Sequence, residues 1–263
     1  MSIINNVFAF DIETVPDVEF GRRLHGLETL TDKQVGYVMH TRQREQTGNE
    51  FLSLEQQRIV AISIAMRSRD GFKVWSLGEP DSPEEELVRR FFDGIERLAP
   101  TLVSWNGAGF DLPVLHYRAL RHKVQAHRYW EMGDMDQSYK WNNYISRFHW
   151  RHVDLMDVLS GFQGRGRIGL DQMSQLLGFP GKLGLTGEGV WDAHIQGRSE
   201  DIRNYCETDV VNTYLIYLRF ELMRGRLTHE EHEREVEIVR AGLTGAEKPH
   251  LRGYLDAWAT CGS

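Results

Sequence analysis

The chain has 263 residues and a formal net charge of −7, from 38 acidic and 31 basic side chains. This length can bury a sizeable core in one large domain or two small ones, and the acidic balance argues against a protein that coats nucleic acid through bulk positive charge. The apolar runs are far shorter than a ~20-residue membrane span, and the first residues lack the pattern of a signal peptide. We therefore expect a cytoplasmic protein with no membrane association.

Short apolar, β-favouring segments predict strands at residues 7–12, 59–66, 72–77, 101–105 and 148–154. Helical signals predict helices at 83–98, 112–122, 155–160, 171–177, 200–224 and 229–240. Three strands come first, and helices then alternate with strands. This order predicts an α/β fold in which helices flank a mixed sheet.

Two of these helices begin with capping signals. Ser82 is a predicted N-cap, with Pro83 at the first helical position and Glu85 closing a capping box. Thr228 and Glu231 form the same kind of box at the start of the 229–240 helix.

Acidic side chains follow the first predicted strand. Asp11 and Glu13 are two residues apart, so they share one face of the strand within reach of a single ion. Two carboxylates so close together are unfavourable without a cation or a shared proton. Taken alone, the pair also fits a strand that runs into a polar turn.

Two more acids, Asp111 and Asp209, are candidates for the same site. Asp111 ends the segment 105–111, WNGAGFD, where two glycines permit a tight turn, although it also fits a residue that caps the next helix. Tyr205 and Asp209 are four residues apart in the longest predicted helix and share one of its faces. An Asp among apolar neighbours needs a partner or a metal, whereas an Asp on the polar face needs neither.

Together the acids and their spacing resemble the DEDD superfamily of 3′→5′ exonucleases. More narrowly, the chain is similar to bacterial and phage proteins described as predicted 3′–5′ exonucleases related to the proofreading domain of family B DNA polymerases. The resemblance covers about residues 7–225. Its segments are FDIET at 10–14, WNGAGFD at 105–111, HVDLMD at 152–157, LDQMSQLLGFPGK at 170–182 and YCETDVVNTYLIYLR at 205–219. Asn204 stands where the related DEDDh branch has a histidine, so the tyrosine branch fits better.

This resemblance implies a ribonuclease-H-like fold and a 3′–5′ exonuclease that releases nucleoside 5′-monophosphates from the 3′ end of single-stranded DNA or RNA. Asp11, Glu13, Asp111 and Asp209 would hold two divalent metal ions, Mg²⁺ or Mn²⁺, which prefer hard oxygen ligands. Two such ions would stabilise the attacking and leaving oxygens of an in-line phosphodiester displacement. Tyr205 would orient the attacking water, because a phenol of pKa ~10 is a poor base at neutral pH.

The expected domain arrangement follows from the extent of the resemblance. Residues 1–225 would form the exonuclease domain, and residues 226–263 a C-terminal helical extension packed on the same domain. The polar connection at 14–57 contains no confident strand and is longer than a minimal nuclease hairpin, so a lid, a specificity element and an oligomer contact all stay open. The choice between DNA and RNA and the oligomeric state also stay open.

Four residues are candidates for substrate binding. Lys182 could contact a phosphate, although a P-loop is excluded because Leu183 replaces the required Ser or Thr. Asn106 could contact substrate or hold the backbone turn. Arg165 and Arg167 lie in the glycine-rich stretch and could grip the nucleic-acid backbone or be solvated.

Other side chains fit structural roles better. Asp154 and Asp157 lie outside the acidic quartet. The aromatic residues of segment 139–144 could stack on bases, but burial in the core is the better interpretation. The histidines show no zinc-ligand spacing with the cysteines.

Two alternative functions compete with the exonuclease. A haloacid-dehalogenase-like phosphatase also has a strand that ends in an Asp, but it needs a second Asp where this chain has Glu13. A non-catalytic, exonuclease-like nucleic-acid-binding module would be expected to lose one or more of the acids that this chain keeps.

Overall fold

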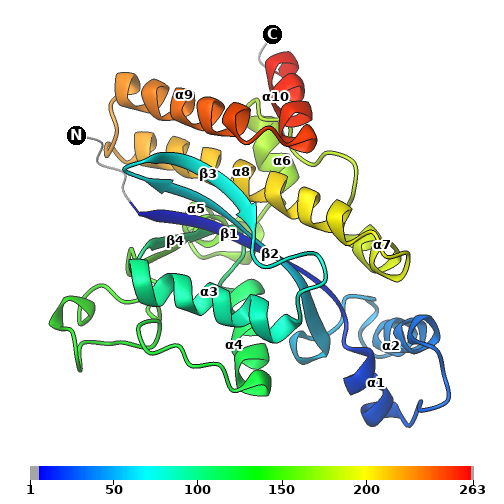
Figure 1. The fold of residues 1–263 in the computed structure, drawn as a ribbon. Helices are drawn as coiled ribbons and strands as arrows, with labels where there is room; N and C mark the ends of the chain where they lie inside the picture. Colours follow the sequence, from blue (N-terminus) through cyan, green and yellow to red (C-terminus); the bar gives the residue numbers. More distant parts are fainter. Residues whose placement is uncertain (1–5, 262–263) are drawn as a thin grey trace.

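The computed structural model describes residues 6–261 and places a five-stranded β-sheet between layers of helices (Figure 1). Residues 1–5, of the predicted exonuclease domain, and residues 262–263, of the predicted C-terminal extension, lie outside the described residues. Among residues 6–261, no helix is long and apolar enough to cross a membrane.

The sheet has the strand order β3-β2-β1-β4-β5. Antiparallel pairs join β1 to β2 and β2 to β3, whereas β4 runs parallel to both β1 and β5. The strands are β1 (Val7–Pro16), β2 (Gln57–Ser68), β3 (Gly71–Ser76), β4 (Thr101–Ser104) and β5 (His152–Asp154). This mixed sheet, flanked by helices, confirms the predicted fold class.

The helices cover both faces of the sheet, with α8 and α9 on one face and α3 and α4 on the other (Figure 1). They are α1 (Val18–His25), α2 (Asp32–Thr47), α3 (Glu84–Leu98), α4 (Asp111–His122), α5 (Leu155–Leu159), α6 (Leu170–Leu176), α7 (Val190–Ile195), α8 (Ser199–Met223), α9 (His229–Gly245) and α10 (Pro249–Cys261). α1 and α2 lie beyond one end of the sheet, and α10 packs against α8 and α9.

The first and last strands differ in length from the prediction. β1 continues to Pro16, beyond the predicted residue 12, because its last residues pair with the start of β2. β5 begins at His152 rather than at residue 148, because the short β4 offers partners only from Leu102 to Ser104.

The prediction for the start of α3 was wrong. Pro83 is the N-cap, without a side-chain capping bond, and α3 begins at Glu84. The hydroxyl of Ser82 instead accepts a hydrogen bond from the backbone N–H of Glu79 at 2.9 Å. At the start of α9 the predicted capping box is confirmed, since Thr228 and Glu231 cap each other's backbone N–H groups at 3.2 and 2.9 Å.

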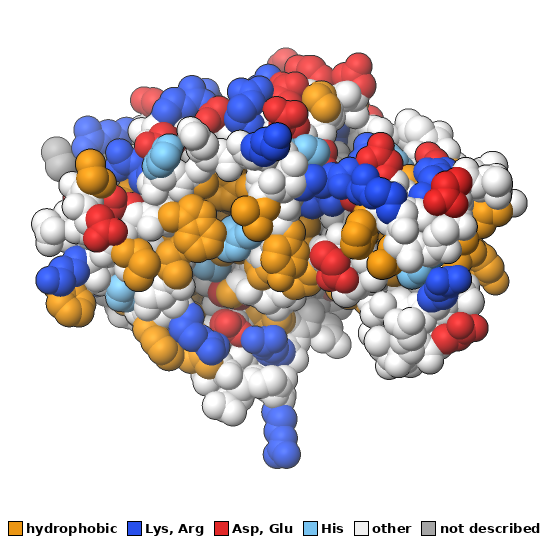
Figure 2. All heavy atoms as spheres, turned by 90° about the horizontal axis from the view of Figure 1, so that it is seen from below, with side chains coloured by type: hydrophobic (Ala, Val, Ile, Leu, Met, Phe, Trp, Pro, Cys, Tyr) orange, Lys and Arg blue, Asp and Glu red, His pale blue; other side chains and the backbone are white. Residues whose placement is uncertain are grey.

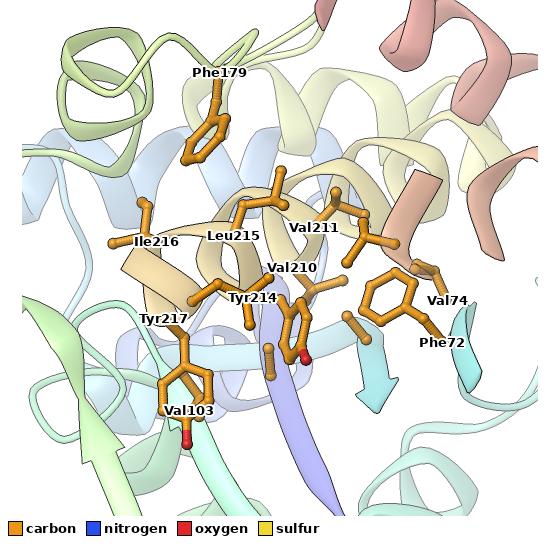
Figure 3. Close-up of a cluster of buried hydrophobic side chains, with 14 of the residues drawn as sticks. Phe72, Val74, Val103, Phe179, Val210, Val211, Tyr214, Leu215, Ile216 and Tyr217 are labelled. Carbon is orange, nitrogen blue, oxygen red and sulfur yellow. The ribbon is translucent and has the colours of Figure 1, made fainter. Parts of the chain in front are cut away.

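Alternation along β1 assigns its side chains to two cores. Phe8, Phe10 and Ile12 belong to the cluster that α3 and α4 cover. Val7 and Ala9 belong to the cluster around α8, in which Tyr214 lies between that helix and the sheet and Leu215 points towards Phe179 (Figure 3). Asp11 and Glu13 continue this second series, so the strand directs them to the α8 side of the sheet.

Candidate active site

The carboxylates of β1 meet helix α8 over the sheet. The thiol Sγ of Cys206, on α8, lies 3.6 Å from Oδ2 of Asp11, which places the first acid directly under that helix. Val210 and Val211 are fully buried against the sheet and fix the position of α8. The packing of α8 on the sheet therefore brings the motif of β1 next to the motif of α8, although the two lie far apart in the sequence.

A tight turn after β4 positions Asp111 at the start of α4. Asn106 adopts a left-handed backbone conformation with φ of 66°. The carboxylate of Asp154, at the end of β5, accepts hydrogen bonds from the backbone N–H groups of Asn106 and Ala108 at 3.0 and 2.8 Å. Oδ1 of Asp111 then accepts the backbone N–H of Ile12 at 3.1 Å, which joins this acid to β1.

The α8 motif places Tyr205 and Asp209 on the same cavity wall. Both side chains are buried, and both line the cavity with the other acids. The ammonium of Lys182 donates a hydrogen bond to the hydroxyl of Tyr205 and lies 3.8 Å from Oδ2 of Asp209. Lys182 therefore belongs to the acidic centre.

Lys182 is held from behind by a chain of hydrogen bonds. Its backbone N–H donates to Oδ1 of Asp171 at 2.8 Å, and the preceding Gly181 leaves that carboxylate room, since a Cβ there would lie 2.4 Å from it. The carbonyl of Gly181 accepts from the side-chain amide of Asn212 at 2.9 Å. The hydroxyl of Tyr254, on α10, donates to Oδ1 of Asn212 at 2.6 Å. The C-terminal helix is thus connected to the site.

The four carboxyl groups have raised pKa values, and burial is the largest cause for each. Burial raises the pKa of Asp111 to about 7 and that of Asp209 to about 6. It also raises the pKa values of Asp11 and Glu13; neighbouring carboxylates raise them further, and the ammonium of Lys182 opposes the shift. Carboxylates packed in this way favour either shared protons or bound cations.

The donor set fits hard divalent cations. Oδ1 of Asp209 is buried and makes no hydrogen bond within the described residues, which leaves it free to bind an ion. Asp11, Glu13 and Cys206 each place one potential ligand atom within 4.8 Å of the others. Burial raises the pKa of the Cys206 thiol, so it stays protonated and is a poor ligand beside carboxylates that suit Mg²⁺ or Mn²⁺.

A cavity of about 970 Å³ opens above these acids. Asp11 is partly exposed on its floor, whereas Glu13, Asp111 and Asp209 are more deeply buried. Other lining residues come from the segment after α2 and from the residues around α7.

The substrate-binding candidates separate into two pairs. Asn106 and Lys182 line the cavity, whereas Arg165 and Arg167 are not among its lining residues. Arg167 forms an ion pair with Asp157. Asn106 holds the turn by its backbone and also faces the cavity.

The structure gives Asp154 and Asp157 structural contacts and buries two of the three aromatic rings of segment 139–144. Asp154 organises the turn before Asp111, and Asp157 pairs with arginines. Tyr139 and Tyr144 are buried in the core, which confirms burial for these two rings, although Trp141 is exposed. The potential metal ligands that cluster within the described part of the chain include no histidine.

One family model matches residues 49–258, under the description "Predicted 3′-5′ exonuclease related to the exonuclease domain of PolB". The chain belongs to this family. The resemblance drawn from the motifs is therefore confirmed, and the mixed sheet agrees with a ribonuclease-H-like exonuclease fold. The match includes Asp111, Tyr205 and Asp209, and it begins after Asp11 and Glu13. No curated protein matches the chain.

Sequence reasoning missed several residues that line the cavity together with the four acids. His40 and Phe51 come from the 14–57 connection, and Trp191 comes from α7. The capping box of Thr31 and Gln34 could have revealed α2. No pattern in the sequence marks Phe51 as a residue of the site.

Proposed function

We propose that the chain is a metal-dependent 3′–5′ exonuclease that hydrolyses phosphodiester bonds at the 3′ end of single-stranded nucleic acid. The observation that carries this proposal is the convergence of four carboxylates from β1, α4 and α8 in one cavity, three of them buried and that of Asp11 partly exposed. Membership in a family of predicted exonucleases supports it. The product class is nucleoside 5′-monophosphates.

Asp11, Glu13, Asp111 and Asp209 would hold two divalent ions, Mg²⁺ or Mn²⁺. When bound, such ions supply a deprotonated water and stabilise charge on the attacking and leaving oxygens. The rigid turn before Asp111 and the buried face of α8 hold the carboxylates in place, so that few rearrangements are needed on binding.

Tyr205 would donate a hydrogen bond rather than remove a proton. Burial raises its pKa above the ordinary value, and the nearby carboxylates raise it further, so the phenol stays protonated at neutral pH. Its oxygen accepts a hydrogen bond from Lys182, and its O–H, which is hydrogen-bonded to the carboxylate of Asp209 in this structure, would turn to a water or a phosphate oxygen when substrate binds. Lys182 would also place a positive charge beside the substrate phosphate.

The alternative functions explain fewer of these contacts. A phosphatase of the haloacid-dehalogenase type would leave Tyr205 and Lys182 without a role. A binding module without activity would not need four neighbouring acids, each with a pKa that burial raises.

The test uses matched DNA and RNA oligonucleotides labelled at the 5′ end, with a free or a blocked 3′ end, in Mg²⁺, Mn²⁺ or EDTA. We expect stepwise shortening of the free 3′ end only with a divalent ion, and a loss of at least about 100-fold in rate for Asp209→Asn. The control is Asp201→Asn, an exposed Asp on the same helix. Absence of shortening with either ion, or full activity in Asp209→Asn, would contradict the proposal.

A further inference from the structure

A single peptide group fixes the backbone of Lys182. Gly181 contributes the carbonyl of this group, which accepts the side-chain amide of Asn212 at 2.9 Å. Lys182 contributes the N–H, which donates to Oδ1 of Asp171 at 2.8 Å. The carbonyl and the N–H of a trans peptide point in opposite directions, so the two hydrogen bonds hold this planar unit from both sides. The position of the Lys182 Cα is therefore defined, although its side chain is long and flexible.

The orientation of the Asn212 amide depends on Tyr254. Asn212 is fully buried in the middle of α8, and its Oδ1 accepts the hydroxyl of Tyr254 at 2.6 Å. Burial raises the pKa of this phenol well above its ordinary value, so the hydroxyl keeps its proton and donates. An amide whose oxygen faces a donor turns its NH₂ group the other way, here toward the carbonyl of Gly181.

Apolar packing holds the same segment against α10. Phe179, two residues before Gly181, is buried, and its ring lies 5.8 Å from that of Trp258, centroid to centroid, with the planes at 82°. Tyr254 and Trp258 are four residues apart in α10 and share one face of this helix. That face therefore makes both the apolar contact and, through Asn212, the polar contact to the segment before Lys182.

The ammonium of Lys182 is the part of this segment that reaches the acidic centre. It donates to the hydroxyl of Tyr205 and lies 3.8 Å from Oδ2 of Asp209. The Lys182 side chain is 33% exposed, so packing does not enclose it, and the place of its ammonium depends on where the backbone begins. Because a held lysine side chain loses much rotamer freedom, a shift of the backbone would release the ammonium from its partners.

We propose that Asn212 and Tyr254 are positioning residues, which hold the backbone of Lys182 where its ammonium meets Tyr205 and Asp209. The last helix of the chain then sets the geometry of the acidic centre, although neither Asn212 nor Tyr254 is among the residues that line the cavity. This inference rests on the proposed function for its effect on cleavage, whereas the placement of Lys182 can be measured without cleavage.

The first measurement reports the placement of Lys182. A low dose of acetic anhydride acetylates lysine amines, and mass spectrometry of the peptides gives the rate at each lysine, with the exposed Lys73 as reference. Tyr254→Phe keeps the ring and removes the hydroxyl. We expect it to raise the rate at Lys182 roughly 3- to 30-fold, because the amine is released from Tyr205 and Asp209.

The control removes an equivalent hydroxyl from another part of the core. Tyr144 is buried, and its hydroxyl donates to the carbonyl of Pro100 at 2.7 Å. Tyr144→Phe should therefore lose comparable stability and leave the labelling of Lys182 unchanged. Equal labelling in the unsubstituted, Tyr254→Phe and Tyr144→Phe proteins, or the same increase in both variants, would overturn the inference.

The second measurement is a double-mutant cycle on cleavage with Mg²⁺. Tyr254→Phe should lower kcat roughly 3- to 30-fold, but by less than about twofold in a protein that already carries Lys182→Met, because the effect passes through the lysine. Asn212→Ala should follow the same pattern with a larger loss, since it removes both hydrogen bonds. A merely structural role for Tyr254 gives the same loss in both backgrounds, and that result would also overturn the inference.

The two measurements separate the positioning role from the proposed function. If Lys182 becomes more reactive in Tyr254→Phe but no protein cleaves, the proposed function alone is wrong. If the unsubstituted chain cleaves and Tyr254→Phe matches it in labelling and in rate, the positioning role alone is wrong. Absence of both cleavage and a change in labelling contradicts both.

Discussion

At the scale of single residues, the site is a set of carboxyl groups that the fold brings together at an electrostatic cost. Asp111 and Asp209 bind protons more tightly in the folded chain than in an unfolded one, because burial raises their pKa values. Only part of this could be predicted from the sequence. Spacing suggested that Asp11 and Glu13 share a face, but Lys182 reaches Tyr205 through a glycine-rich stretch without periodicity, and no pattern predicted that contact.

These shifts predict how the stability of the metal-free protein depends on pH. The pKa is raised to about 7 for Asp111 and about 6 for Asp209, so proton binding by these two carboxyl groups stabilises the folded state. This contribution to the free energy of unfolding is complete below about pH 4 and is lost as the pH rises through 6 to 7. We expect the Tm in EDTA to fall between about pH 5 and 8. Asp209→Asn should flatten this fall and raise the Tm at about pH 8 by about 2–4 °C, which corresponds to about 1 kcal/mol. Thermal unfolding at several pH values checks this, and equal slopes for both proteins would contradict it.

At the scale of elements, most strands and helices follow from local patterns, and the exceptions have physical causes. Helix α8 was predicted because of its length and its many apolar residues, which the structure buries on all sides, and α9 because Thr228 and Glu231 cap it. α1, α2 and α7 were missed, and α10 was predicted only as part of a helical extension, without bounds. α7 is short, and α2 buries few residues, so neither shows a broad apolar stripe. The start of α3 was mispredicted because the hydroxyl of Ser82 accepts the backbone N–H of Glu79 and does not cap the helix.

The turn between β4 and α4 depends on one carboxylate from a neighbouring strand. Asp154→Ala would leave the backbone N–H groups of Asn106 and Ala108 without their acceptor. We expect a loss of about 2–4 kcal/mol in the free energy of unfolding and a larger loss of activity than of binding, because the turn positions Asp111. Urea unfolding measures the first quantity. Asp93→Ala, on the exposed face of α3, should change stability by less than about 0.5 kcal/mol, and a similar loss in both variants would contradict this role for Asp154.

At the scale of the whole molecule, the sheet and the helices on its two faces carry the four acids. The segment after α2 and the residues around α7 supply further lining residues of the cavity. The family match extends through most of α10, whose Tyr254 supports Lys182 through Asn212. The division at residue 225 into an exonuclease domain and an extension stays a prediction, and these contacts join its two sides. The face in Figure 2 also carries exposed hydrophobic side chains among basic ones.

A divalent ion should stabilise the whole molecule, because the carboxylates come from β1, α4 and α8. At 100 times its Kd, Mg²⁺ adds about 2.7 kcal/mol to the free energy of unfolding, which raises the Tm by about 5–10 °C. Asp11→Asn should have opposite effects in two conditions: a higher Tm than the unsubstituted chain in EDTA, and little or no gain from Mg²⁺. Thermal unfolding with and without the ion measures both, and a full gain from Mg²⁺ in Asp11→Asn would place the ion elsewhere.

The distribution of the acids along the chain has a consequence for synthesis on the ribosome. Asp11 and Glu13 emerge first and Asp111 next, but Tyr205 and Asp209 follow only when α8 has been made. α8 also covers the sheet on the side to which β1 directs its acids, so the four carboxylates meet only after this helix docks. A growing chain therefore carries an incomplete set of carboxylates while it is surrounded by ribosomal and messenger RNA, and the proposed hydrolytic centre is complete only once α8 has been made and has docked.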